Sequence, residues 1–140
     1  MKNKADIIKQ INSRTTGTLV ENLGIVITDI GALSVSGKMP VDKRTLQPFG
    51  LLHGGASVAL AETLGSIGGG MQVDFKTHSV VGIEINSSHL RSISTGWVYG
   101  KATAVRVGKK IQVWEISITN SNRKIISKSR LTLAVITNDN

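Results

Sequence analysis

Glu62 is the residue of this chain that most needs a chemical explanation. It is the only charged residue between positions 52 and 67, where bulky apolar residues recur at helical spacing and small residues fill most other positions. This pattern predicts a central, largely buried helix that runs to about Val73. Because an ionised carboxylate in such a place is costly unless another group pairs with it or uses it, Glu62 is a candidate catalytic residue.

The start of the predicted helix is a candidate site for a negatively charged group. His53 precedes Gly54 and Gly55 there, and the free backbone N–H groups of a first helical turn attract negative charge. Glycine also lets a ligand approach without a Cβ in the way, so both glycines are predicted to present N–H donors to a developing oxyanion. The structural alternative is a glycine turn that only precedes the helix.

Length and composition limit the class of protein. A chain of 140 residues predicts one domain, residues 1–140. The chain has no cysteine, no apolar run long enough to span a bilayer and no segment of the signal-peptide kind, so we expect a soluble, cytoplasmic protein without a thiolate metal site. Its histidines, His53, His78 and His89, are too irregularly spaced to predict a metal site of another kind.

The charge balance indicates an anionic partner. Seventeen Lys and Arg against nine Asp and Glu give a formal net charge of +8, which suits a nucleic acid, an acidic membrane surface or a phosphate-bearing small molecule. Aromatic residues are scarce, at 4%, and do not alternate with Arg and Lys, and no basic amphipathic helix is visible. We therefore expect a phosphorylated small molecule, with neither nucleic acid nor membrane as partner.

Residue periodicity predicts an antiparallel sheet packed on one helix. We expect a short amphipathic helix within residues 1–12 and strands at 23–30 and 32–39, the second ended by Pro40. A loop over residues 42–51 leads to the central helix. Further strands are expected at 79–87, 97–107, 110–119 and 124–136. Because helices and strands do not alternate regularly, the predicted class is α+β.

Several motifs carry a resemblance to a known family. They are Met39-Pro40-Val41-Asp42, Gln47-Pro48-Phe49-Gly50, Leu52-His53-Gly54-Gly55-Ala56-Ser57, Ala61-Glu62 and Val81-Gly82-Ile83-Glu84-Ile85-Asn86. Together they resemble hotdog-fold acyl-CoA thioesterases, over nearly the whole chain. The most similar branch hydrolyses aromatic acyl-CoA esters and includes 1,4-dihydroxy-2-naphthoyl-CoA, 4-hydroxybenzoyl-CoA and enterobactin-pathway proofreading thioesterases. The resemblance implies an α+β hotdog fold, an antiparallel sheet wrapped around one long central helix.

The resemblance also implies roles for particular residues. Glu62 matches the catalytic carboxylate, acting as nucleophile or as general base for water. Gln47 and His53 match side chains that contact or orient the thioester carbonyl, which the Gly54 N–H polarises. Ser66 matches a hydroxyl that holds the carboxylate or water. The implied substrate-binding positions are Gly55, Gly82, His89, Arg91, Lys109 and Lys110, the two lysines as phosphate contacts. No metal and no separate cofactor are expected, since coenzyme A is part of the substrate.

Helix geometry bears on the assembly. Gly54 and Glu62 lie eight positions apart, which places them about 12 Å from each other along a helix axis. Since one reacting carbonyl cannot contact both, we expect a homodimer with antiparallel helices and active sites shared across the interface. The resemblance agrees and implies that such dimers pair into homotetramers, as dimers of dimers.

Two other functions stay open at this point. One is a hotdog enoyl-thioester hydratase or dehydratase, and the other is a non-catalytic acyl-CoA-binding module. The acyl group is also undetermined. Small residues around Glu62, namely Ala59, Gly65 and Ser66, leave room for a ring, so an aromatic acyl group is the prediction.

Overall fold

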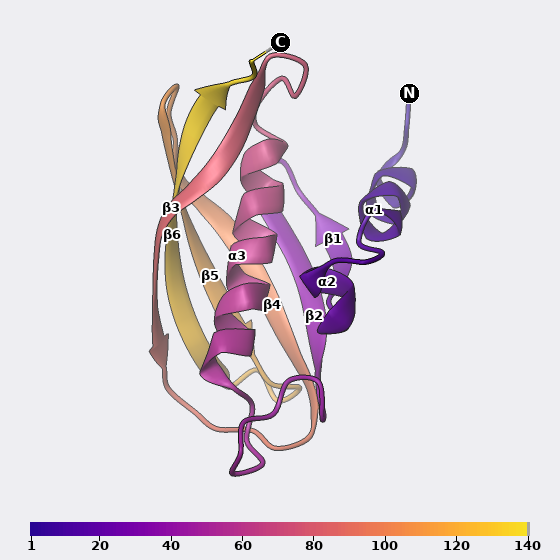
Figure 1. Cartoon of the computed structure of the whole chain (residues 1–140), viewed down its shortest axis with the longest axis vertical. Helices are drawn as coiled ribbons and strands as arrows, with labels where there is room; N and C mark the ends of the chain where they lie inside the picture. The colour runs from indigo at the N-terminus through magenta and orange to yellow at the C-terminus, as the bar shows by residue number, and fades with distance from the viewer. Residues whose placement is uncertain (140) are drawn as a thin grey trace.

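Six strands form one antiparallel sheet, which curves around a long helix (Figure 1). The structure is a computed structural model and describes residues 1–139. Its elements are α1 (Lys4–Ser13), α2 (Leu19–Asn22), β1 (Val26–Ile30), β2 (Ser34–Val41), α3 (Gly54–Gly70), β3 (His78–His89), β4 (Gly96–Val107), β5 (Ile111–Thr119) and β6 (Ile125–Thr137). The strand order is β1-β2-β4-β5-β6-β3, and all neighbouring strands are antiparallel. The predicted α+β architecture is confirmed.

The core lies between α3 and the concave face of the sheet. Leu60 and Leu64 of α3 are 0% exposed, as are Trp114 of β5 and Leu131 of β6. Four such side chains in contact with one another exclude water from a continuous apolar layer. The apolar stripe of α3 therefore covers the middle of the sheet and leaves Glu62, on another face of the helix, beside the edge strand β3.

Glycines bring the second half of α3 close to the sheet. A Cβ built on Gly68 would lie 2.7 Å from two atoms of the Trp114 ring, whereas one built on Gly70 would have no neighbour within 4 Å. The glycine-rich end of the helix thus reflects close packing at Gly68 and only a lack of constraint at Gly70. This difference distinguishes a required glycine from a dispensable one in the same turn.

Gly68→Ala is expected to lower the free energy of unfolding by about 1–3 kcal/mol, because the buried, rigid indole cannot move to admit a methyl group. Gly70→Ala is the matched control, and it should raise stability by about 0.5–1 kcal/mol because alanine loses less backbone entropy. Urea unfolding followed by tryptophan fluorescence measures both. Equal effects of the two substitutions would show that Trp114 does not set the packing distance.

The C-terminal end of α3 is held by a buried polar side chain. Gln112 is 0% exposed, donates to the carbonyl of Gly69 at 3.2 Å and accepts the indole N–H of Trp114 at 2.9 Å. The helix ends at Gly70 rather than at the predicted Val73. Its end is tightened because the N–H groups of Gln72 and Val73 bond to carbonyls three residues back.

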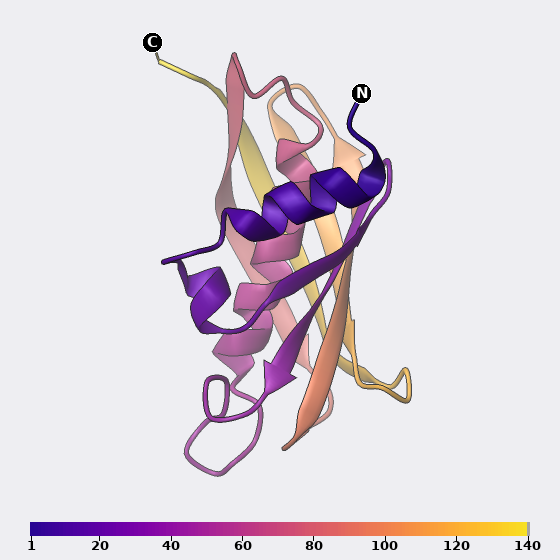
Figure 2. The ribbon, with the colours of Figure 1, turned by 90° about the vertical axis from the view of Figure 1, so that its right-hand side faces the viewer.

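The amphipathic N-terminal helix is confirmed as α1, whose apolar residues Ile7, Ile8 and Ile11 pack against the core. Both α1 and α2 lie at the β1 end of the sheet, beside α3 (Figure 2). The one-turn helix α2 was not predicted, and β1 begins at Val26 instead of residue 23. Four residues are too few for a helical period to be detected.

Pro40 does not end its strand as predicted, because β2 continues to Val41. The last residue of β2 opposite β1 is Lys38, so Pro40 is paired only with Trp97 of β4. A proline is tolerated where its missing N–H would face away from the single neighbouring strand.

Within residues 1–139, no helix has both the length and the apolar character needed to cross a lipid bilayer.

Candidate active site

The first turn of α3 is capped by the side chain of His53. Its Nδ1 accepts the N–H of Gly55 at 2.8 Å, and its carbonyl accepts the N–H groups of Ala56 and Ser57. The prediction that Gly55 presents a free N–H is therefore wrong, because the imidazole already uses it. Within residues 1–139, the Gly54 N–H makes no hydrogen bond. Gly54 is the donor left for a ligand.

The cap also determines the tautomer of His53. A ring nitrogen that accepts a hydrogen bond carries no proton, so the neutral imidazole of His53 has its proton on Nε2. Nε2 is then a donor. It is directed away from Gly55 and available to an oxygen atom near the helix start.

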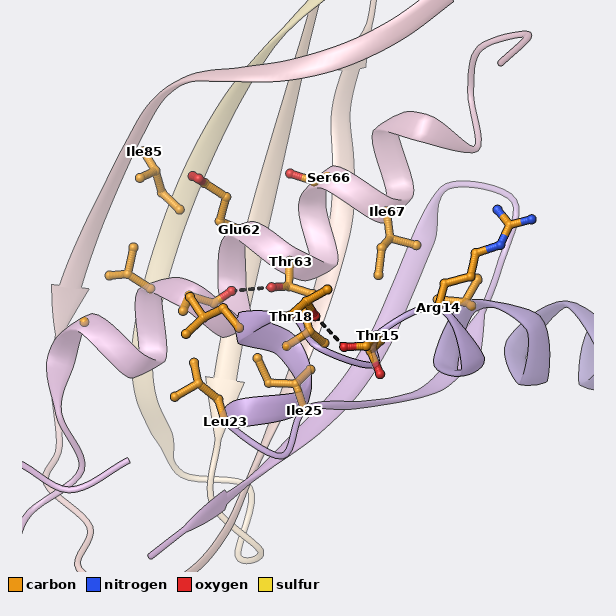
Figure 3. A pocket seen from close by; sticks show the side chains of 16 residues that line it. Arg14, Thr15, Thr18, Leu23, Ile25, Glu62, Thr63, Ser66, Ile67 and Ile85 are labelled. Carbon is orange, nitrogen blue, oxygen red and sulfur yellow. Dashed lines mark hydrogen bonds between the residues drawn. The ribbon is translucent and has the colours of Figure 1, made fainter. Parts of the chain in front are cut away.

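Glu62 lies in a cavity of about 800 Å³ between α3, β3 and the N-terminal residues 11–25 (Figure 3). We call it the Glu62 cavity. Glu62 is half-buried. Gly65, which was expected to leave room for a ring, is instead buried against Leu131 of β6 and does not line the cavity. The small residues Ala59 and Ser66 form the face of α3 that does. Such a face leaves volume for a ligand that larger residues would occupy.

The Glu62 carboxylate has no ion-pair or hydrogen-bond partner within residues 1–139. Ser66 lies one turn further along α3 and lines the same cavity. Across from the carboxylate is Gly82 of β3, where a Cβ would lie 3.6 Å from Cδ and from both carboxylate oxygens of Glu62. The structure thus brings Glu62, Ser66, Gly55 and Gly82 together, and it leaves the carboxylate uncommitted.

A second group of predicted residues lines a separate cavity of about 450 Å³ at the start of α3, the Gly54 cavity. Gln47, Gly54, His89 and Arg91 lie there. The imidazole of His89 lies so close to Gly54 that a Cβ on Gly54 would be 3.0 Å from its Nε2. The side-chain oxygen of Gln47 accepts the N–H of Phe49, so its amide NH₂ is the free end.

The loop that carries Gln47 is anchored at its beginning. Arg44 donates to both carboxylate oxygens of Asp42, and these hydrogen bonds lower the pKa of Asp42 to about 2. Thr45 is buried and donates to the carbonyl of Pro40 at 2.8 Å. The loop therefore leaves β2 in a defined direction and places Gln47 beside the helix start.

The two lysines predicted as phosphate contacts lie elsewhere in the chain. Lys109 lines a third cavity, of about 450 Å³, with Asp74 and His78. Lys110 is exposed and lines none of these three cavities. Asp74 follows the C-terminal end of α3, and a helix of 17 residues separates its ends by about 24 Å. Within one chain these lysines are therefore remote from Gly54.

One wall of the Glu62 cavity was not predicted. Eight of the 16 lining residues belong to the N-terminal residues 11–25, among them Arg14, Thr15, Thr18 and Leu23. These residues have no motif that indicates a site. Their role follows from the tertiary position of α2, which periodicity does not report.

Known proteins match this chain over most of its length. Residues 49–127 match the Thioesterase superfamily. The proofreading thioesterase EntH of Cronobacter sakazakii is 46% identical over 129 residues, which cover 92% of this chain and 93% of EntH. A crystal structure of a Haemophilus influenzae thioesterase is 45% identical, with a TM-score of 0.89 over 93% of this chain and 90% of that one. A mutant thioesterase of Pseudomonas aeruginosa is 40% identical, with a TM-score of 0.92 over 94% of both chains.

A curved antiparallel sheet around one long helix is the architecture of the hotdog fold. The chain belongs to the Thioesterase superfamily. The predicted fold and enzyme class are thereby confirmed.

Proposed function

We propose that this protein hydrolyses an acyl-CoA thioester with an aromatic acyl group, releasing the free acid and coenzyme A. The observation that carries the proposal is the unpaired carboxylate of Glu62 in a cavity whose walls are mostly apolar. A carboxylate held this way has no structural task among the described residues. The volume of the Glu62 cavity, about 800 Å³, lies in the range of small-molecule sites.

The chemistry suits the residues of both cavities. Glu62 either attacks the thioester carbonyl carbon, giving an acyl–glutamate anhydride that water then hydrolyses, or accepts a proton from the water that attacks. In both routes the carbonyl oxygen becomes an oxyanion that accepts the Gly54 N–H, while Nε2 of His53 and the amide of Gln47 orient the carbonyl. The C–S bond breaks, and the thiolate leaves without needing a strong acid. Ser66 holds the carboxylate or the attacking water.

The separation of the two cavities supports a dimer with shared sites. Gly54 and Glu62 line different cavities of one chain. Strand β3, whose Gly82 lies next to Glu62, has 12 residues and forms one edge of the sheet. Its Val81 and Ile83 are exposed, and a long edge strand with exposed apolar residues is suited to pair with another strand. In our proposal, β3 pairs with its copy, and Glu62 meets the helix start of the partner subunit.

The positive charge of the chain suits the phosphates of coenzyme A. His89 and Arg91 lie beside Gly54, at the end of the site where the sulfur leaves. Lys109 and Lys110 are remote from Gly54 in their own chain. In this proposal the two lysines therefore contact the phosphates of a coenzyme A bound at the site of a neighbouring subunit, in the dimer or in a tetramer.

A thiol-release panel tests the substrate class. We expect kcat/KM for benzoyl-CoA and 4-hydroxybenzoyl-CoA to exceed that for hexanoyl-CoA and palmitoyl-CoA by about tenfold or more. A flat ring fills the cavity beside Ala59 and, unlike a flexible alkyl chain, loses little conformational entropy when it binds. Faster turnover of the aliphatic esters would contradict the aromatic preference. Tight binding of every ester without release of thiol would favour a binding module, and hydration of an enoyl-CoA would favour a hydratase.

A further inference from the structure

The N-terminal residues 11–25 form a closed loop whose two ends are joined, and we call this segment the N-terminal wall. The side chain of Asn12 donates to the carbonyl of Ile27 and accepts its N–H, both at 2.9 Å. This pair of hydrogen bonds fixes the end of α1 against the start of β1. The segment between them, which contains α2, is therefore held at its base and lies over the Glu62 cavity (Figure 3).

The wall presents an apolar surface with one cation. Leu19, Val20, Leu23 and Ile25 line the cavity from this side. Arg14 is the only Lys or Arg among the lining residues, and Figure 3 shows it on the side away from Glu62, beyond Ile67. Its guanidinium has no ion-pair partner within residues 1–139. The two charges of the cavity are therefore separated, with Glu62 at one side and Arg14 at the other.

Most other donors around the cavity are already used. The hydroxyls of Thr15, Thr18 and Thr63 donate to the backbone carbonyls of Asn12, Thr15 and Ala59 at 2.9, 2.6 and 2.6 Å. The Gly55 N–H donates to His53. Among the residues of the N-terminal wall that line the cavity, Arg14 is thus the side chain with uncommitted donors, whereas Ser66 is the uncommitted hydroxyl next to Glu62.

From this arrangement we infer that the N-terminal wall selects the acyl group, and that Arg14 recognises an oxygen atom at the end of the acyl group remote from the thioester. The inference rests on the proposed function, which places the thioester carbonyl at Glu62. An acyl group directed from Glu62 toward Arg14 crosses the apolar part of the wall first. A phenolic or carboxylate oxygen at its far end then accepts from the guanidinium, which binds such oxygens with well-defined geometry.

The inference predicts a change of selectivity in Arg14→Met. The variant keeps an apolar stem of similar length and loses only the donors. Because Arg14 is exposed and its hydrogen bond is screened by solvent, we expect kcat/KM for 4-hydroxybenzoyl-CoA and 4-carboxybenzoyl-CoA to fall about five- to tenfold. Benzoyl-CoA and 4-methylbenzoyl-CoA should change less than about twofold. The two oxygen-bearing esters distinguish a phenol from a carboxylate as the preferred group.

Lys9→Met is the matched control, because Lys9 is an exposed cation of α1 that does not line the cavity. It should leave all four rates unchanged. Arg14→Met rates that fall equally for all four esters, or that do not fall for any, would overturn the inference while leaving thioester hydrolysis established. If the unsubstituted protein cleaves none of the esters, the proposed function fails. Calorimetric Kd values for the same four esters then decide whether Arg14 still discriminates among them.

Discussion

Glu62→Gln is expected to fold as the unsubstituted protein does and to lose activity by about 10²- to 10⁴-fold in kcat. The amide has the same shape as the carboxylate but cannot attack a carbonyl or accept a proton from water. Because the Glu62 carboxylate has no hydrogen-bond or ion-pair partner within residues 1–139, its loss removes no structural interaction. Stability and substrate affinity should therefore be retained.

The measurements are thiol release, Tm and the Kd for a substrate acyl-CoA. Glu115→Gln is the matched control, since Glu115 is an exposed carboxylate of β5 that does not line the Glu62 cavity. It should keep normal rates. Near-normal hydrolysis in Glu62→Gln would reject a catalytic role for this carboxylate, whatever the effect on binding.

The positions of most strands could be predicted because local patterns report them. Strands β4, β5 and β6 alternate apolar and polar residues, and their observed bounds differ from the expected ones by a single residue at any end. The helix α3 was predicted from the spacing of Leu60 and Leu64, which are buried as expected. Periodicity succeeds here because each residue is buried by the element to which it belongs.

Other features depend on contacts between distant segments, and local patterns do not report these. Pro40 was expected to end a strand, but β2 continues past it. Strand β1 stops pairing with β2 at Lys38, so no β1 residue lies opposite Pro40 to need the N–H that proline lacks. The capping of Gly55 by His53 depends on a side-chain rotamer. Arg14 lines the cavity only because Asn12 is bonded to Ile27 across 15 positions of the chain.

The candidate site was predicted in parts that one chain does not unite. Glu62, Ser66 and Gly82 do lie together, as do Gln47, Gly54 and His89. The two groups line separate cavities because Gly54 and Glu62 lie eight positions apart on one helix. A complete site that combines the two groups therefore needs either a large rearrangement of α3 or a second chain. The rigid packing of α3 on Trp114 favours the second chain.

Mixing two inactive variants is expected to restore activity if the sites are shared. In a dimer of His53→Ala and Glu62→Ala chains, one site carries both changes and the other carries neither. Each mixed dimer should therefore have at most half of the wild-type activity, and an equimolar, fully exchanged mixture about one quarter. His53→Ala also loses the helix cap, at about 0.5–2 kcal/mol. Its folding is therefore checked first by Tm, and Gln47→Ala, which leaves the cap intact, replaces it if the Tm falls below the assay temperature.

Subunit exchange is followed by native mass spectrometry with one variant isotopically labelled, and thiol release is recorded on the same sample. A mixture of labelled and unlabelled Glu62→Ala chains is the control, and it should stay inactive at every degree of exchange. Activity that rises in proportion to the mixed species, and only in the two-variant sample, places Glu62 and His53 of different subunits in one site. If the mixed dimers form and no thiol is released, the two residues act within one chain or not together, and the path of the substrate must be redrawn around the Glu62 cavity alone.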